Sequence, residues 1–416
     1  MRKKAASAEV LSIGTELIRG DHLDSNSPFL SRALSKIGIS TKQFTVVPDF
    51  PLSSLIRTIR KIWKRSDLLF VCGGLGPTDD DVTRQAIAEA VGRDLVFYPD
   101  LLGIIRRRFK KRGVPMPDLN RRQAYLPRGA RAIPNPVGSA PGILFEKNRK
   151  ILVSLPGVPI ELKAMFEKSV FPYLRRRFGT RSASLSVTLR TAGVAESRVN
   201  ELIQDIVAKE KKVSFGFYAH PGLVEVKLTV PPTPEGKKHL VRVEHLVCGR
   251  FGSSLFGKGD DRLEEVIFKL LEKKNKTVSV GESCTGGFLS SHLTSIPGSS
   301  RHFKMGVVAY HNKIKSSILK VPPKLIRSRG AVSEEVARSL AQQARRLGKT
   351  DYGLGVTGIL GPGGGTKTKP VGLIYAAVAS PKGVTSRQFN FLGEREIMRI
   401  RVVRATLDLL RRELLK

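Results

Sequence analysis

Short apolar runs that end in glycine-rich turns and then enter helix-like segments most constrain this fold. Such runs fall at residues 10–13, 68–71 and 151–155 in the first part of the chain, and at 277–280 and 352–356 in the last part. A short, wholly apolar strand followed by a helix is typical of a parallel sheet covered on both faces. Ligands bind such sheets at the carboxyl ends of the strands, where these turns lie. The pattern therefore predicts two α/β units, each with a glycine-rich binding edge.

The segment between these two parts has a different pattern. Residues 184–190 and 224–230 alternate like half-buried strands, and residues 196–208 have helical periodicity. A stretch rich in glycine and charge at 257–261 ends the segment. A chain of 416 residues exceeds one hydrophobic core. We therefore expect two parallel-sheet α/β domains, at residues 1–178 and 258–416, joined by a small α+β domain at residues 179–257.

The composition narrows the class of protein. No apolar run approaches the roughly 18 residues of a membrane span, and the basic N-terminus leads directly into a strand-like segment, unlike a signal peptide. Three widely spaced cysteines fit neither a disulfide framework nor a zinc ribbon. A cytoplasmic protein with no membrane partner is expected.

The formal net charge of +36 is spread along the whole chain. Basic runs at 106–112 and 175–177 fit either solvated helix faces or a non-specific attraction for polyanions. Aromatic residues are poorly interleaved with these runs, and no helix-turn-helix, zinc-finger or ribonucleoprotein motif is present. Nucleic acid is therefore not the expected partner.

The heptapeptide Gly281-Glu282-Ser283-Cys284-Thr285-Gly286-Gly287 lies between an apolar run and a helix-like run at 288–293. This order predicts a serine hydroxyl at a helix N-terminus, where free N–H groups and the positive dipole end gather. That position suits a nucleophile whose oxyanion needs donors, or a phosphate site. The alternative is that Ser and Thr only cap the helix while the glycines only turn the chain.

In the N-terminal part, the loops at 14–17, 73–83 and 156–159 follow predicted strands. A rigid loop at 135–142 precedes the last of those strands. Asp80 and Asp81 supply hard oxygen ligands that suit a divalent cation. The alternative is an acidic cluster that matches the dipole of the following helix.

Taken in order, these strings resemble the CinA (competence/damage-inducible) family along nearly the whole chain. The N-terminal part resembles the MoaB/MogA-like molybdopterin-binding fold through 14–17, 73–83 and 155–159. The C-terminal part is similar to the nicotinamide-nucleotide amidohydrolases. The strings that carry this similarity are 282–287, 307–310 with Asn312 and Lys315, and 357–358 before 361–365.

For the C-terminal domain, the resemblance implies hydrolysis of nicotinamide mononucleotide to nicotinic acid mononucleotide and ammonia, without a cofactor. It implies Ser283 as nucleophile, Lys315 as base, and Tyr310 as a residue that relays or orients a proton. It does not select the neighbouring Lys313 or His311. The substrate-binding residues expected on this basis are Thr285, Gly286, Asn312, Thr357, Gly358, Gly361, Gly363, Gly364, Gly365 and Arg399. Arg395 and Arg401 are alternatives to Arg399 as the phosphate partner.

For the N-terminal domain, the resemblance implies a metal-dependent ADP-ribose pyrophosphatase. The chain departs from the usual family pattern beside Asp49, where Pro48 and Phe50 replace a glycine and an asparagine, so a vestigial domain is the alternative. Asp80 and Asp81 are the expected metal ligands. The expected nucleotide site comprises Gly14, Thr15, Glu16, Asn26, Gly73, Gly74, Gly76, Thr78, Asn135 and Gly157.

Two classes of function follow. The first is an enzyme of pyridine-nucleotide salvage, whose partners are nicotinamide mononucleotide and ADP-ribose. The second is a non-enzymatic pterin- or nucleotide-binding protein that acts in competence or the DNA damage response. The resemblance also implies a homodimer.

Overall fold

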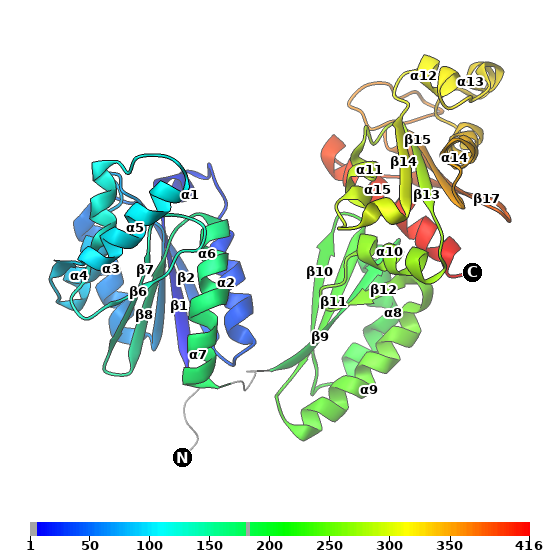
Figure 1. Cartoon of the computed structure of the whole chain (residues 1–416). Coiled ribbons are helices and arrows are strands. Elements are labelled where there is room, and N and C mark those ends of the chain that lie inside the picture. Colours follow the sequence, from blue (N-terminus) through cyan, green and yellow to red (C-terminus); the bar gives the residue numbers. More distant parts are fainter. Residues whose placement is uncertain (1–5, 180–183) are drawn as a thin grey trace. The chain divides into compact units, whose positions relative to one another are not determined.

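A computed structural model describes residues 6–179 and 184–416 of the chain. The chain divides into two compact units, Met1–Leu185 and Ser186–Lys416 (Figure 1). Each unit is built around its own sheets. None of the described helices combines the length and the hydropathy of a membrane span.

The first unit is built on a six-stranded sheet of order β2-β1-β3-β8-β7-β6. Strands β2, β1, β3 and β8 are parallel, whereas β7 and β6 are antiparallel additions at one edge. The carboxyl ends of the parallel strands therefore share one edge of the sheet. The strands are β1 Ser7–Ile13, β2 Ser40–Val47, β3 Leu68–Cys72, β6 Arg131–Ile133, β7 Gly142–Lys147 and β8 Lys150–Leu155.

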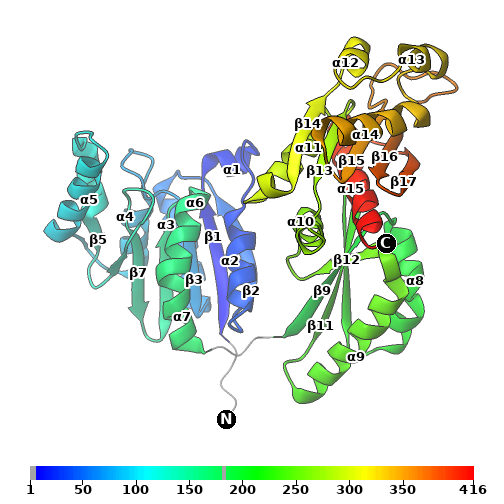
Figure 2. The ribbon, with the colours of Figure 1, turned by 45° about the vertical axis from the view of Figure 1, so that its right-hand side comes forward.

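Helices cover both faces of this sheet, because alternate residues of its strands face two separate apolar cores (Figure 2). Helices α2, α6 and α7 pack on one face against Val10, Phe70 and Val153. Helices α3 and α4 pack on the other face against Leu11 and Val71. The remaining elements of the unit are α1 Thr15–Arg19, α2 Asn26–Ser35, α3 Leu52–Arg65, α4 Thr83–Val91, β4 Leu95–Phe97, α5 Pro99–Lys111, η1 Asp118–Ala124, β5 Tyr125–Pro127, α6 Pro159–Met165, η2 Phe166–Val170 and α7 Phe171–Phe178.

The second unit begins with a β-α-β-β-α-β segment whose sheet has the order β10-β11-β9-β12. This is the split βαβ arrangement, in which the first and last strands are neighbours. Its elements are β9 Leu185–Ala192, α8 Glu196–Lys209, β10 Ser214–His220, β11 Leu223–Val230, α9 Pro234–Phe251, η3 Gly252–Ser254 and β12 Leu255–Lys258. Strand β12 pairs with β9 and extends past the domain boundary expected at residue 257.

The rest of the second unit is a five-stranded sheet of order β14-β13-β15-β16-β17, with the first three strands parallel and the last two antiparallel. Helices α10, α11 and α15 cover one face, and α14 covers the other. The elements are α10 Leu263–Lys273, β13 Val278–Glu282, α11 Phe288–Thr294, η4 Ser299–Arg301, β14 Phe303–Val308, α12 Asn312–Ser317, α13 Pro323–Arg329, α14 Glu334–Gly348, β15 Tyr352–Gly358, β16 Leu373–Ser380, β17 Gly383–Asn390 and α15 Arg395–Leu414.

The α/β architecture with a small α+β domain between two larger ones is confirmed. Both large sheets are mixed rather than wholly parallel, because a hairpin adds antiparallel strands at one edge of each. Strands β7 and β17, together with β10 and α9 in the middle segment, lay outside the prediction.

Helix α15 joins the middle segment to the C-terminal sheet. The Asp408 carboxylate forms ion pairs with Arg411 (2.6 Å) and Arg412 (2.7 Å), and the side chains of Asp408 and Arg411 are almost fully buried. The Arg411 guanidinium also donates to the Ser253 carbonyl, and Arg404 donates to the Pro221 carbonyl. The two segments consequently share polar contacts as well as an apolar core.

Candidate active site

A cavity of about 270 Å³ lies where the parallel strands of the C-terminal sheet end. Residues expected from the sequence to form the site supply most of its wall. The lining includes Ser283, Tyr310, Asn312, Lys315, Thr357, Gly358, Gly361, Gly363 and Gly364, together with Cys284 and Arg395. Ser283 and Lys315 thus face the same cavity.

The turn that carries Ser283 differs from its expected form. Helix α11 begins at Phe288, as the helix-like run at 288–293 predicts, and Gly287 is its N-cap. The amides of Leu289 and Ser290 in its first turn donate to the Glu282 carboxylate (3.1 and 3.2 Å). The expectation that Ser283 sits at a helix N-terminus with free donors was therefore wrong, because four residues separate the two and Glu282 already occupies the helix end.

Backbone hydrogen bonds fix the start of this turn. The Ser283 amide donates to the Val356 carbonyl of β15 (3.0 Å), and the Gly286 amide donates to the Ser283 carbonyl (3.1 Å). The amides of Cys284 and Thr285 donate to no backbone carbonyl of the described chain. These two N–H groups, rather than those of α11, are the nearest candidates to stabilise an oxyanion beside Ser283.

Ser283 and Cys284 are adjacent, similarly buried, and both line the cavity. Burial raises the pKa of the Cys284 thiol to about 12, so this thiol stays protonated at neutral pH. Ser283 is only 7% exposed and lines the cavity. A serine needs an adjacent base to become a nucleophile, which directs attention to the amine across the cavity.

Lys315 is buried, with 2% of its surface exposed, although lysine is rarely buried without an ion pair. Its Nζ donates to the Tyr310 carbonyl (3.1 Å). No acidic partner of Lys315 is found among the described residues. Burial lowers the pKa of Lys315. A lysine in this state carries its proton weakly and is suited to accept one from a hydroxyl.

Tyr310 and His311 have separate surroundings. The Tyr310 hydroxyl accepts a hydrogen bond from Arg395 Nη2 (3.1 Å), and the side chain is 61% exposed at the mouth of the cavity. His311 Nδ1 instead accepts from the Lys313 amide (3.2 Å) and so caps α12. Asn312 is the first residue of α12, and Lys315 follows one turn later.

The glycine-rich loop after β15 forms another wall. Gly361 has φ 67° and Gly364 has φ 86°, conformations that bring the backbone close to the cavity and that favour glycine. Thr357 is buried and donates to the Ala331 carbonyl (2.9 Å). Gly365 packs against Val371 and, like Thr285 and Gly286, lies outside the lining.

Arg395, not Arg399, lines the cavity. Arg395 Nη1 donates to the Gly361 carbonyl (2.7 Å), which ties the first turn of α15 to the glycine-rich loop. Arg399 pairs with Glu396 (2.8 Å), and its guanidinium lies over the Phe288 ring, 4.8 Å from the ring centre. Arg401 donates to the Leu392 carbonyl. Of the three arginines, Arg395 is therefore the one placed to meet a ligand.

In the first unit, the loops expected to form a nucleotide site converge. The Gly73 amide donates to the Leu155 carbonyl (3.0 Å), and Asn26 Nδ2 donates to the Gly157 carbonyl (2.7 Å). Thr15 donates through its amide and hydroxyl to Asp49, so Asp49 holds the first loop despite its altered neighbours. Asn26 Oδ1 is buried and has no partner. A buried acceptor without a partner can accept a hydrogen bond from a bound ligand.

Several other expected residues of this site shape its loops. Asn135 accepts from the amides of Val137 and Gly138 and donates to Glu161. Glu16 folds over Gly14, where a Cβ would lie 2.3 Å from a carboxylate oxygen. A side chain at Gly74 would meet Thr83 in the same way.

Asp81 is engaged within its own loop. Its carboxylate accepts from the amides of Gly76 (2.7 Å) and Thr78 (2.9 Å) and from the Thr78 hydroxyl (2.5 Å). Asp80 is exposed, and no group of three or more potential metal-ligating His, Cys, Asp or Glu side chains occurs in the part of the chain that the structure describes. The donor set fits a closed turn better than a cation site.

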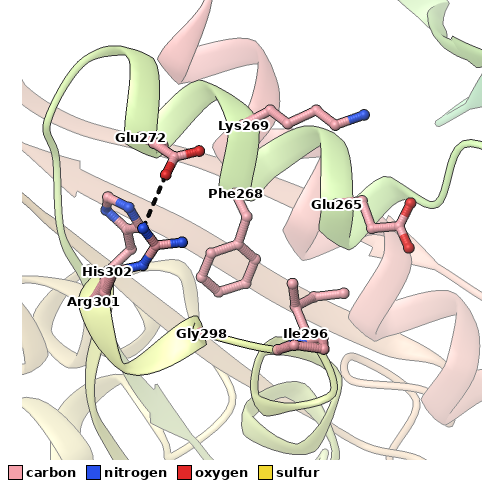
Figure 3. Close-up of a pocket in the computed structure, with 9 residues that line it drawn as sticks. Glu265, Phe268, Lys269, Glu272, Ile296, Gly298, Arg301 and His302 are labelled. Atoms are coloured by element: carbon pink, nitrogen blue, oxygen red, sulfur yellow. Dashed lines mark ion pairs between the residues drawn. The ribbon is translucent and has the colours of Figure 1, made fainter.

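A smaller cavity, of about 190 Å³, lies near the amino ends of β13 and β14. The Phe268 ring lies between His302 and Ile296, and Arg301 pairs with Glu272 at 3.2 Å (Figure 3). None of the residues expected from the sequence to form a site lines it. It lies at the opposite ends of the strands from the cavity that contains Ser283.

The sequence-based prediction did not include Glu282, and it named Arg395 only as an alternative to Arg399 as the phosphate partner. Glu282 belongs to the heptapeptide at 281–287. An acidic residue directly before a turn of small residues that leads into a helix is a sequence signal for a carboxylate that accepts from the helix N-terminus. Arg395 and Arg399 are four residues apart on one helix, so helical periodicity alone places them on the same face.

Comparison with known families matches the chain in three segments. The family described as CinA C-terminal domain matches residues 260–414. The family described as probable molybdopterin binding domain matches residues 9–176. Residues 186–257 match the damage-inducible protein CinA KH domain.

Similar proteins extend along the whole chain. A CinA-like protein of Dictyoglomus thermophilum is 40% identical over 410 residues, which cover 98% of this chain and 99% of the relative. A protein of Caldicellulosiruptor bescii named as competence-damage inducible is 39% identical over 410 residues, with 98% and 99% covered. The crystal structure of CinA from Thermoplasma acidophilum is 34% identical and covers 39% of this chain and 95% of that chain, with a TM-score of 0.37.

Proposed function

The chain belongs to the CinA family of competence-damage inducible proteins, and on that basis we propose that its C-terminal domain hydrolyses nicotinamide mononucleotide. The products are nicotinic acid mononucleotide and ammonia. The observation that carries the proposal is that Ser283 and the buried Lys315 line the same cavity.

In the first step, Lys315 in its neutral form accepts the Ser283 proton as Ser283 Oγ attacks the carboxamide carbon. The C–N bond of the resulting tetrahedral intermediate then breaks, and Lys315 returns the proton to the leaving nitrogen, which departs as ammonia. In the second step, water attacks the acyl ester, Lys315 accepts a water proton, and Ser283 regains its hydrogen as the acid is released. The amides of Cys284 and Thr285 are the candidate donors to the oxyanion in both steps.

The cavity wall supports a nucleotide substrate. Arg395 offers a fixed cationic side chain, and the glycine-rich loop brings the backbone of Gly361, Gly363 and Gly364 to the cavity surface. A guanidinium with open backbone around it suits a phosphate group.

The test is the Ser283→Ala variant. We expect ammonia release from nicotinamide mononucleotide to fall by at least about 1,000-fold, because the acyl ester cannot form. Circular dichroism and thermal unfolding should match the wild type. Turnover equal to the wild type would refute the proposal, and absence of turnover in the wild type itself would favour a binding protein.

For the first unit we propose a nucleotide site that accepts ADP-ribose. The unpartnered Asn26 Oδ1 beside the converging glycine loops supports this. Two quantities are measured in the wild type and in Asn26→Leu, with and without divalent cations: binding of ADP-ribose, and release of AMP and ribose phosphate from it. We expect the variant to bind ADP-ribose more weakly. Equal binding by both proteins would contradict the placement, and binding without products would identify a binding domain.

A further inference from the structure

Glu282 is the last residue of β13 and directly precedes Ser283. Its side chain is fully buried. No described Lys, Arg or His side chain forms an ion pair with it. An isolated buried carboxylate is costly unless hydrogen bonds replace its lost hydration. Its partners therefore indicate what this carboxylate does.

Each oxygen of Glu282 accepts two hydrogen bonds. Oε2 accepts from the Thr285 hydroxyl (2.6 Å) and the Leu289 amide (3.1 Å). Oε1 accepts from the Ser290 hydroxyl (2.6 Å) and the Ser290 amide (3.2 Å). One side chain thus holds both the middle of the turn and the first turn of α11.

Glu282 is itself held by the sheet on both sides. Its backbone pairs with Val308 of β14 and Val356 of β15, and its carbonyl accepts from the Ala309 amide (2.7 Å). Ser283 is therefore the first residue of a loop whose start is fixed by the sheet and whose far end is fixed by the Glu282 carboxylate. Neither Glu282 nor Ser290 lines the cavity.

We propose that Glu282 is a positioning residue for Ser283. By closing the turn at 283–287, its carboxylate sets the direction of the Ser283 hydroxyl and of the free amides of Cys284 and Thr285. This inference rests on the proposed function for the identity of the substrate, but not for the geometry of the nucleophile.

The test compares Glu282→Gln with a matched variant, Asp351→Asn. Glutamine keeps the shape of glutamate but replaces one acceptor oxygen by an NH2 group, which would face the Leu289 or Ser290 amide. Asp351 likewise accepts from a backbone amide and a hydroxyl, those of Thr277 (both 2.9 Å), and also pairs with Lys276 (2.9 Å), at the amino ends of β13 and β15. Both variants lose an acceptor, and only one of them loses it beside the nucleophile.

Two reactions are measured. The first is hydrolysis of nicotinamide mononucleotide, described by its kcat and KM. The second is sulfonylation of Ser283 by phenylmethanesulfonyl fluoride, in which an O–S bond forms and fluoride leaves, and which needs no nucleotide. We expect Glu282→Gln to lower kcat about 100-fold with little change in KM and to slow sulfonylation comparably. Asp351→Asn should lower Tm and leave both rates near the wild type.

The outcomes separate this inference from the proposed function. Wild-type protein that is sulfonylated but does not hydrolyse the nucleotide would refute the proposed substrate, and the sulfonylation comparison would still decide the role of Glu282. The inference would be overturned by any of three results. Glu282→Gln could hydrolyse the nucleotide and be sulfonylated at wild-type rates, Asp351→Asn could lose as much of both rates as Glu282→Gln, or the wild type could fail to be sulfonylated. If Glu282→Gln does not fold, Ser290→Ala takes its place, with an expected loss of about tenfold in both rates, and unchanged rates would overturn it.

Discussion

Lys315 and Lys313 show how two residues of one type, two positions apart, acquire different chemistry. Lys315 is buried against Tyr310, whereas Lys313 is exposed on the opposite side of α12. Residues two apart on a helix point in different directions, so only one of the pair can face the cavity. Sequence alone supplied no reason to choose between them, and the choice came from the family resemblance.

For this pair we expect Lys315→Met to lower kcat by about 100- to 10,000-fold, the range for loss of a general base. Lys313→Met should stay near the wild-type rate. The pH dependence gives a second check. Because burial lowers the pKa of Lys315, the neutral base forms at lower pH than for an exposed lysine. The rate should therefore rise with pH and level off below the usual lysine range. Equal losses in the two variants would contradict the assignment.

Arg395 and Arg399 form a second matched pair. Arg395 donates to Tyr310 and to the Gly361 carbonyl at the cavity, whereas Arg399 is occupied by Glu396 and Phe288. We expect Arg395→Met to raise KM for nicotinamide mononucleotide by at least about tenfold, because a charged hydrogen bond to the phosphate is lost. Arg399→Met should change KM little. Steady-state kinetics at one pH measure KM for both variants. A larger increase in KM for Arg399→Met than for Arg395→Met would identify Arg399 as the phosphate partner.

At the scale of elements, the apolar strands and their glycine turns were predictable because each fully buried strand leaves a continuous apolar run in the sequence. The antiparallel edge strands were not. The β7–β8 hairpin turns through Asn148 and Arg149, both with positive φ, and neither is the glycine that usually marks such a turn. Strand β17 is largely exposed and polar, so its sequence lacks the apolar signature of a buried strand.

The helix predicted at 288–293 begins where α11 begins, but Ser283 does not lie at its N-terminus. The small residues at 283–287 fit a helix cap as well as an open turn. In the structure, Gly286 (φ 58°) and Gly287 (φ 94°) have left-handed backbone conformations, and Glu282 contacts Leu289 and Ser290, so the turn forms. A side chain that satisfies a helix end from outside the helix is a tertiary contact that periodicity cannot reveal.

Helix α15 contains the buried pair of Asp408 and Arg411. Asp408→Asn removes a charge from this pair and leaves Arg411 buried without its counter-ion, so we expect the free energy of unfolding to fall by about 3–5 kcal/mol. The pair of Glu396 and Arg399 on the same helix, in which the Glu396 carboxylate is exposed, provides the control. Glu396→Gln should change stability by no more than about 1 kcal/mol. Denaturant unfolding measures both, and similar small changes would show that the buried pair is not important for stability.

At the scale of the whole molecule, the middle segment and the C-terminal domain behave as one compact unit. Leu223 and Phe256 of the middle segment belong to the same apolar cluster as Val402 and Leu407 of α15. The hydrophobic pattern of the sequence predicts a boundary between these segments, because the pattern changes where the local structure changes. A shared core cannot be predicted in this way, since it depends on contacts between residues that are distant in the sequence.

Truncated chains test whether the middle segment and the C-terminal domain share one hydrophobic core. Residues 186–416 should unfold in one transition and keep the proposed amidohydrolase activity. Residues 258–416 lose Leu223 and Phe256, each worth about 1.5–3 kcal/mol when fully buried. We expect the shorter fragment to be less stable by about 3 kcal/mol or more, as measured by denaturant unfolding. Equal stability of the two fragments would show that the middle segment is an independent attachment.

Helix α15 is held at both ends: Arg395 at its start contacts the glycine-rich loop at the cavity, and Arg411 and Arg412 near its end contact Ser253 of the middle segment. Inserting one residue between these anchors would turn everything beyond it by about 100° and advance it by about 1.5 Å. One anchor would then lose its partners. Among natural relatives, gaps inside this helix should therefore be rare and, where they occur, should come in lengths near whole helical turns.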